Sequence, residues 1–346
     1  MPTLTFQSED TVTIKDEDEY LHPAPEGTEG LWSDNLWFSF VDREADIHGI
    51  NHIHVTNKGY ARFSTCLVID GIPMPWANKV PYHDIGKFDK LTDGGRMTYE
   101  VVKPQQELRL QADNEKYGYD VTFTGRFPVF DYEDCINGNP LKSAGVYGGH
   151  YEQGLLCQGE FEVRAGPNQG RRQINCYSHR DHSWTDRFTH GSPWEVQQPR
   201  NLQSSLGHYW PSVQTDNFHL NAFGWMNPDF KPLNPEQHSI GGFLSDANGS
   251  RPIQDAECLE CRLELDGRSA MSFRYQFTLP DGDIIHVKTG RKYAQSVNGL
   301  MRGENDAECL LDCYEGFFDF EVEETGERGY GVAEYSINPP YPRWRY

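Results

Sequence analysis

The chain has 346 residues, more than one hydrophobic core usually supports, so we expect two domains or one large β-domain. A net charge of −21 argues against nucleic acid and anionic membrane surfaces as partners, because both require a basic footprint. Hydrophobic residues make up 37% and no run reaches eighteen apolar positions, so we expect no membrane insertion. The first 23 residues lack the pattern of a secretory signal, and a cytoplasmic location is the expectation.

Period-two alternation of apolar and polar residues, punctuated by turns, predicts strands throughout the chain. Helical periodicity is nearly absent, and Gly (33) and Pro (21) suit tight turns. The predicted strands lie in 36–42, 49–56, 60–71, 97–103, 106–112, 119–130, 159–166, 172–184, 207–214, 218–226, 239–246, 261–267, 271–290 and 314–337.

A single open sheet of this size would curl or split, and closure removes exposed edges. The sequence therefore predicts an all-β protein of two consecutive antiparallel β-barrels. The stretch 191–205, rich in Pro, Gln and Ser, places the boundary near 190, giving domains 1–190 and 191–346. A break near 140 is the alternative.

Two cysteine pairs have spacings that can hold zinc. Cys258 and Cys261 form C-x2-C, and Cys309 and Cys313 form C-x3-C, but both pairs lie in strand-like segments, which favours buried, reduced thiols. His52 and His54 share one strand face, a spacing found in some β-barrel metal sites, without acidic neighbours in sequence. We expect no metal and no cofactor.

The stretch 175–190, NCYSHRDHSWTDRFTH, is the densest cluster of ionisable residues. On a strand, His179, Asp181 and Ser183 share one face, while Arg180, His182 and Trp184 share the other. A carboxylate beside an apolar lumen has a raised pKa and can donate a proton near neutral pH. The structural alternative is an Arg-Asp ion pair and a buried Trp that lock the strand.

A second cluster precedes this strand. His150, Tyr151 and Glu152 lie in GGHYEQG, within reach as a neighbouring strand, and could orient a hydroxyl group or a water molecule. An ordinary strand start is equally compatible with these residues. Most Trp residues are expected in the cores, and some could line a pocket for an apolar ligand.

The segment CYSHRDHSW (176–184) resembles the D-H-x-W motif of the tandem lipocalin-like family that includes carotenoid 1,2-hydratases (hydroxyneurosporene synthases) and AttH-like proteins. It is closest to uncharacterised members with R-D-H-S-W. The stretches LWSDNLWFSFVD, HYEQG and RGYGVAEY fit the same family in the expected order. The resemblance implies two consecutive lipocalin-like barrels with a ligand pocket near their junction. It also implies that Asp181 protonates an isoprenoid double bond.

These observations lead to a carbon–oxygen lyase (hydratase or dehydratase) that acts by acid–base catalysis on a small hydrophobic, terpenoid-like alkene or alcohol. The alternatives are a non-catalytic lipid or isoprenoid carrier and a cofactor-free isomerase or cyclase; a homo-oligomer is left open. The expected catalytic residues are Asp181 as acid and base, His182 or His179 to tune it, and Tyr151 and Glu152, with His150, to place water. The expected substrate-binding residues are Trp184, Trp37, Trp210, His150 and Arg180.

Overall fold

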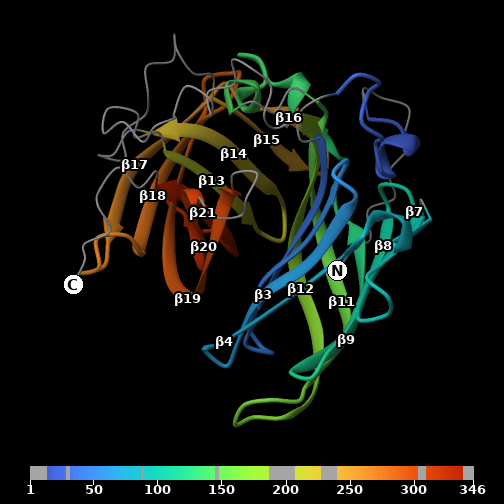
Figure 1. Ribbon diagram of the computed structural model, residues 1–346. Coiled ribbons are helices and arrows are strands. Elements are labelled where there is room, and N and C mark those ends of the chain that lie inside the picture. The colour runs from blue at the N-terminus through green and yellow to red at the C-terminus, as the bar shows by residue number, and fades with distance from the viewer. Residues whose placement is uncertain are drawn as a thin grey trace. The chain divides into compact units, whose positions relative to one another are not determined.

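Two curled antiparallel sheets form nearly all of the regular structure in this computed structural model (Figure 1). The structure describes residues 14–28, 32–87, 89–144, 148–186, 207–226, 240–302 and 309–337. Within these ranges the helical elements are four short 3-10 helices: η1 (Asp16–Glu19), η2 (Tyr82–Asp84), η3 (Tyr132–Asp134) and η4 (Pro140–Ala144). No helix among the described residues is long and apolar enough to cross a membrane.

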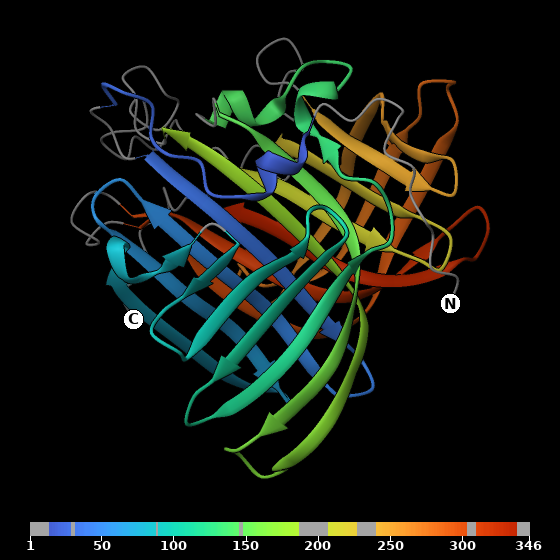
Figure 2. The ribbon, with the colours of Figure 1, turned by 90° about the vertical axis from the view of Figure 1, so that its right-hand side faces the viewer.

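The first sheet has twelve strands, and its curl can be followed through the blue-to-green strands of Figure 2. The last long strand, β12, pairs with the first, β1, as expected for a meander that curls back on itself. In spatial order the strands are β4 (Ile72–Pro81), β3 (Tyr60–Ile69), β2 (Ile47–Thr56), β1 (Trp32–Asp42), β12 (Gly170–Asp186), β11 (His150–Val163), β9 (Tyr117–Gly125), β8 (Glu107–Asp113), β7 (Met97–Lys103), β6 (Lys90–Thr92) and β5 (Gly86–Lys87), with β10 (Phe130–Asp131) paired to β11.

The second sheet has nine strands, and its last strand, β21, pairs with its first, β13, in the same way. In spatial order they are β16 (Gly249–Pro252), β15 (Gly241–Asp246), β14 (His219–Met226), β13 (Gly207–Gln214), β21 (Arg328–Ile337), β20 (Cys309–Val322), β19 (Ile284–Arg302), β18 (Ala270–Thr278) and β17 (Asp255–Leu263).

The two sheets repeat one topology. In each, the first four strands lie side by side in chain order, and the last strands of the unit follow on the other side of the first strand. The register repeats as well: Trp37 lies opposite Asp181, which lies opposite Glu152, and in the second sheet Trp210 lies opposite Glu334, which lies opposite Glu315. The segments HYE (150–152) and CYE (313–315) occupy equivalent positions, an internal repeat that inspection of the sequence did not reveal.

Each sheet buries its own aromatic core. In the first, Phe38 and Phe40 of β1 pack against Phe123, with ring centroids 5.0 and 5.8 Å apart. In the second, Phe273 stacks on Tyr275 with centroids 5.4 Å apart. Strand β8 shows the strict alternation of buried and partly buried residues that the sequence predicted. The expectation of an all-β fold of two lipocalin-like antiparallel barrels is confirmed, each as a curled half-barrel sheet.

The chain divides into two compact units. The first contains the described residues up to Asp131, those in 148–186, and Ser245–Ser250; the second contains the remaining described residues. The proposed boundary near residue 190 and the stretch 191–205 lie outside the described residues. The two-domain division at 190 therefore stays a prediction.

Candidate functional site

The central strand β12 carries its polar residues on two opposite faces, as the alternation predicted. The register places His182 between Leu36 of β1 and Tyr151 of β11, and it places Asp181 between Trp37 and Glu152. The expected site residues therefore separate into two groups, because neighbouring residues of a strand point to opposite sides of the sheet.

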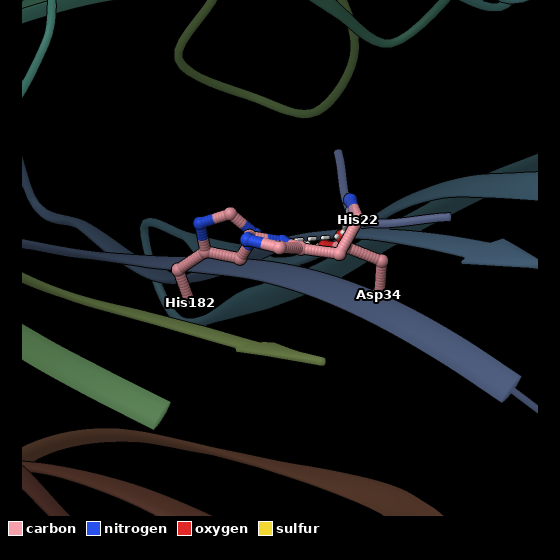
Figure 3. Close-up of side chains that lie close together, drawn as sticks. All are labelled: His22, Asp34 and His182. Carbon is pink, nitrogen blue, oxygen red and sulfur yellow. Dashed lines mark hydrogen bonds and ion pairs between the residues drawn. The ribbon is translucent and has the colours of Figure 1, made fainter. Parts of the chain in front are cut away.

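On the first face, Asp34 joins two histidines, which converge on its carboxylate in Figure 3. Its Oδ1 lies 2.8 Å from Nε2 of His182. Its Oδ2 lies 3.2 Å from Nδ1 of His22 and accepts a 2.6 Å hydrogen bond from the His22 backbone N–H. The Tyr151 hydroxyl lies 3.1 Å from Nδ1 of His182. We call His22, Asp34, Tyr151 and His182 the Asp34 cluster.

The Asp34 carboxyl group is ionised at neutral pH. Burial raises its pKa, but the charge of His182 and hydrogen bonds from His182 and His22 outweigh this and lower the pKa to about 2. An ionised carboxylate only accepts hydrogen bonds, so Nδ1 of His22 and Nε2 of His182 must both carry hydrogen. Nε2 of His22 is then the ring nitrogen that can exchange a proton; it lies 3.6 Å from Oδ1 of Asp18.

Aromatic packing fixes the ring of His22. The Trp184 indole stacks on it, with centroids 3.6 Å apart and planes 7° apart. Nε1 of Trp32 donates a 2.8 Å hydrogen bond to the His22 carbonyl. Trp184, expected as a substrate-binding residue, thus holds a histidine in place.

A pocket of about 230 Å³ opens beside this cluster. His22 and Asp34 form part of its wall, together with Leu21, Pro23, Ala24, Trp32, Val55, Thr56, Asn57, Gly59 and Tyr82. Its volume is below the roughly 300–1,000 Å³ of pockets for drug-sized ligands, so it suits a compact molecule or one end of a longer one. Its lining combines apolar side chains with three ionisable ones, those of His22, Asp34 and Tyr82, a mixture found in small-molecule sites.

A buried ion pair lies next to the Asp34 cluster and contacts it through Tyr151. Arg180 is paired through both terminal nitrogens with Glu19, and both side chains are fully buried. Burial raises the Glu19 pKa, but the charge of Arg180 and its hydrogen bonds lower it overall. Nε of Arg180 donates to Gln153 at 3.0 Å, so the guanidinium is engaged by protein groups. The sequence suggested, as a structural alternative, an ion pair between Arg180 and an aspartate of the same strand. In the structure, the carboxylate that pairs with Arg180 is that of Glu19.

Glu19 also connects to the Asp34 cluster. The Tyr151 hydroxyl donates to Oε1 of Glu19 at 3.1 Å and approaches Nδ1 of His182. The Tyr151 hydroxyl has one proton, and while that proton is donated to Glu19 the hydroxyl oxygen can only accept from His182. Glu19, Tyr151, His182 and Asp34 form a continuous chain of polar contacts.

On the opposite face of β12, Glu152 lies between two histidines. Its Oε1 is 2.8 Å from Nε2 of His150, and its Oε2 is 3.2 Å from Nε2 of His179. Burial raises the Glu152 pKa, but hydrogen bonds from His150 and His179 and their charges lower it to about 2. We call these three residues the Glu152 cluster.

The remaining expected site residues lie around the Glu152 cluster or in the second unit. Trp37 is buried, and its ring meets His179 edge-on with centroids 5.9 Å apart. Asp181 is half-buried on this face, opposite the one that carries Asp34 and the pocket. Trp210 is buried in the second unit, where it lies opposite Glu334.

Among the described residues, two groups have ligand atoms within 4.8 Å of one another and could hold a metal ion: His22, Asp34 and His182, and His208, Cys313 and Glu334. Cys313, from the C-x3-C pair noted in the sequence, belongs to the second group, whereas the C-x2-C pair and the two neighbouring histidines of β2 lie elsewhere. Cys258 lies in the second core with its thiol pKa raised by burial to about 12, and Cys261 packs against that core. His52 and His54 stack in parallel, centroids 5.9 Å apart, and Nε2 of His52 lies 3.3 Å from Oδ1 of Asn35.

Inspection of the sequence missed His22, Asp34 and Glu19. Glu19 and His22 lie in an acidic segment before the first strand, Glu19 at the end of the short helix η1 and His22 three residues after it. Asp34 lies in a strand whose apolar residues led us to expect a core strand. The D-x-x-x-H spacing of Asp18 and His22 would have been a weak signal at most. The contacts of Glu19 with Arg180 and of Asp34 with His182 join residues more than 100 positions apart.

Comparison with known proteins supports the fold and assigns the family. A crystal structure of a Nitrosomonas europaea protein provisionally identified as AttH aligns with 99% of this chain and 100% of its own length, with a TM-score of 0.59 and 10% identity. A Nostoc punctiforme protein of unknown function from the DUF3598 family covers 94% of this chain and 99% of its own, with 10% identity and a TM-score of 0.18, too low to inform the fold. No functionally curated protein matches. The family model described as a domain of unknown function, DUF7064, matches residues 15–339, and the chain belongs to this family.

Proposed function

We propose that the protein is an acid–base enzyme of the hydratase or dehydratase type, with the Asp34 cluster as its catalytic group. The observation that carries the proposal is His22, held at the pocket wall by an ionised, buried carboxylate and by a stacked indole. A histidine that is oriented by a carboxylate through one ring nitrogen and forms part of a pocket wall has the arrangement of a general acid and base.

The substrate would be a compact, weakly polar alcohol or alkene. In the dehydration direction, Nε2 of protonated His22 gives its proton to the substrate hydroxyl, the C–O bond breaks, and water leaves. The now neutral His22 accepts a proton from the neighbouring carbon, and the C=C bond forms. Hydration is the reverse sequence. The ionised Asp34 stabilises the positive imidazolium in each direction, and the apolar wall residues hold the substrate.

The low pKa values of the two carboxyl groups favour a histidine as the group that transfers the proton. Asp34 and Glu152 both have pKa values of about 2, so each is a carboxylate at neutral pH and has no proton to donate. Their effect is to orient imidazole rings. His182 and Tyr151, expected as catalytic residues, would then relay or buffer the proton behind His22.

Asp181, to which the family resemblance assigns the acid role, lies on the other face of β12 from His22 and Asp34. We therefore propose that the Asp34 cluster is catalytic and that Asp181, on the face of β12 that carries the Glu152 cluster, has a structural role. The tandem-barrel hydratases that the 176–184 motif resembles support the reaction class, and the pocket volume favours a substrate much smaller than a carotenoid.

The proposal is tested by oxygen exchange. The protein is incubated in H₂¹⁸O with C10 and C15 tertiary isoprenoid alcohols, and ¹⁸O incorporation is followed by mass spectrometry. A reversible dehydratase introduces the label into the alcohol, and His22→Gln should abolish this. Binding of the alcohols without exchange, detected by quenching of tryptophan fluorescence, would instead support the carrier, and rearranged products without label would support the isomerase or cyclase.

A further inference from the structure

Three side chains of metal-ligating type meet in the second sheet. His208 lies on β13, Glu334 on β21 and Cys313 on β20, three strands that are direct neighbours. The register places His208 opposite Ser336, and Ser336 opposite Cys313, so these residues share one face. Their ligand atoms lie within 4.8 Å of one another. His208 and Cys313 are buried, and the Glu334 side chain is 15% exposed.

His208 is already oriented as a metal ligand would be. Its Nδ1 lies 2.6 Å from the Ser336 hydroxyl, which turns Nε2 toward Glu334, 2.6 Å from Oε1. The Phe223 ring stacks on the imidazole, with centroids 5.1 Å apart and planes 19° apart. A hydrogen bond to the far nitrogen that fixes the ring and its tautomer is the usual outer support of a metal-bound histidine.

The internal repeat allows the same three register positions to be compared in the two sheets, and their residues differ. The equivalent register positions in the first sheet hold Asn35, His150 and Asp181. There the histidine at the Cys313 position pairs with Glu152, and an amide occupies the place of His208. The thiol and the imidazole together are therefore features of the second sheet alone, among the described residues.

We propose that His208, Cys313 and Glu334 bind one divalent transition-metal ion of the Zn²⁺ type. One nitrogen, one sulfur and one carboxylate oxygen give a three-residue set that leaves a fourth tetrahedral position open. The thiolate favours Zn²⁺ over Mg²⁺ or Ca²⁺, which prefer oxygen ligands. When the metal binds, the Cys313 thiol loses its proton, and the proton shared by His208 and Glu334 is also released to solvent. The affinity for the metal ion therefore rises with pH. The site is independent of the Asp34 cluster.

Cobalt titration tests the site, because Co²⁺ bound by a thiolate gives a sulfur-to-metal charge-transfer band. The full-length protein is stripped with a chelator and titrated with Co²⁺, then with Zn²⁺. We expect the band to saturate at one equivalent and Zn²⁺ to displace Co²⁺. Cys313→Ser should lose the band, whereas the control Cys261→Ser, a half-buried thiol of the same unit, should keep it.

Glu334→Gln provides a second variant that preserves the size of the side chain and the hydrogen bond with His208. It should keep the band and weaken Co²⁺ binding about tenfold or more. Circular dichroism confirms that each variant is folded. The proposal is overturned if the wild type shows no thiolate band, if Cys313→Ser keeps it, or if Glu334→Gln binds Co²⁺ as tightly as the wild type.

Discussion

Replacing Asp34 by Asn removes one charge from a buried hydrogen-bond network and changes the side-chain volume little. The folded protein lowers the Asp34 pKa from 3.8 to about 2. At about 1.36 kcal/mol per pKa unit, this difference of about 1.8 stabilises the folded state by about 2.4 kcal/mol at neutral pH. An Asn side chain also offers one acceptor oxygen where the carboxylate offers two, which leaves His22 or His182 facing an NH₂ group. We expect Asp34→Asn to cost about 2–4 kcal/mol.

The pH dependence follows from the direction of the shift. The unfolded chain protonates Asp34 more readily than the folded protein does, so the stabilisation is complete above about pH 5 and is lost as the pH falls to about 2. About half of it should remain at pH 3. Because the amide of the Asp34→Asn variant does not titrate, the difference between wild type and variant should shrink over the same range.

Urea denaturation at pH 7, 4 and 3 measures both quantities. Asp120→Asn is the matched control, because its carboxylate pairs with Arg109 on the surface, 45% exposed, where an ion pair contributes about 0–1 kcal/mol. The reasoning is wrong if Asp34→Asn and Asp120→Asn are equally stable at pH 7. It is also wrong if the cost of Asp34→Asn is the same at pH 7 and pH 3.

Three further predictions concern the first unit. Arg180→Met leaves Glu19 buried without its partner and should destabilise the protein by about 3–5 kcal/mol in the same denaturation assay; a cost below about 1 kcal/mol would contradict the pairing. Glu152→Gln should lower stability at pH 7 and lose that effect toward pH 2, since the folded Glu152 pKa is lowered from 4.5 to about 2, and a pH-independent cost would argue against the ionised form. Both Gly49 and Gly59 have positive φ angles, 150° and 82°, so an alanine strains the backbone at either position. Gly49→Ala should lower the thermal midpoint more than Gly59→Ala, because a Cβ at Gly49 also overlaps the Cys66 carbonyl oxygen, whereas a Cβ at Gly59 has no other atom within 4 Å; a smaller effect at Gly49 would contradict the close approach of β2 and β3.

The fold was predictable from the sequence because the alternation in segments such as 107–113 reflects burial directly. Strand existence follows from local pattern, and an all-β chain of this length has few architectures open to it. Strand order is a different matter. The pairing of β1 with β12 depends on contacts between residues that are distant in sequence. The repeat that places Trp210 opposite Glu334, as Trp37 is opposite Asp181, joins segments of the two units that share few identical residues.

The candidate site was predictable only in part. Alternation along 179–184 separated the two faces of β12 correctly, and HYE was correctly expected to lie beside that strand. The sequence could not show that Glu19, in helix η1, pairs with Arg180 of β12, or that His22 contacts Asp34 of β1. It also could not show that Asp34 binds the same histidine that was assigned to Asp181.

The comparison of Asp34→Asn with Asp181→Asn in the ¹⁸O-exchange assay tests the catalytic assignment most directly. Both substitutions neutralise one carboxylate on neighbouring strands, β1 and β12, but on opposite faces of the sheet. We expect Asp34→Asn to lose exchange at least about 100-fold while still binding the alcohol, and Asp181→Asn to keep exchange within a few-fold of the wild type. Loss of exchange in Asp181→Asn with full activity in Asp34→Asn would place the chemistry on the other face and contradict it.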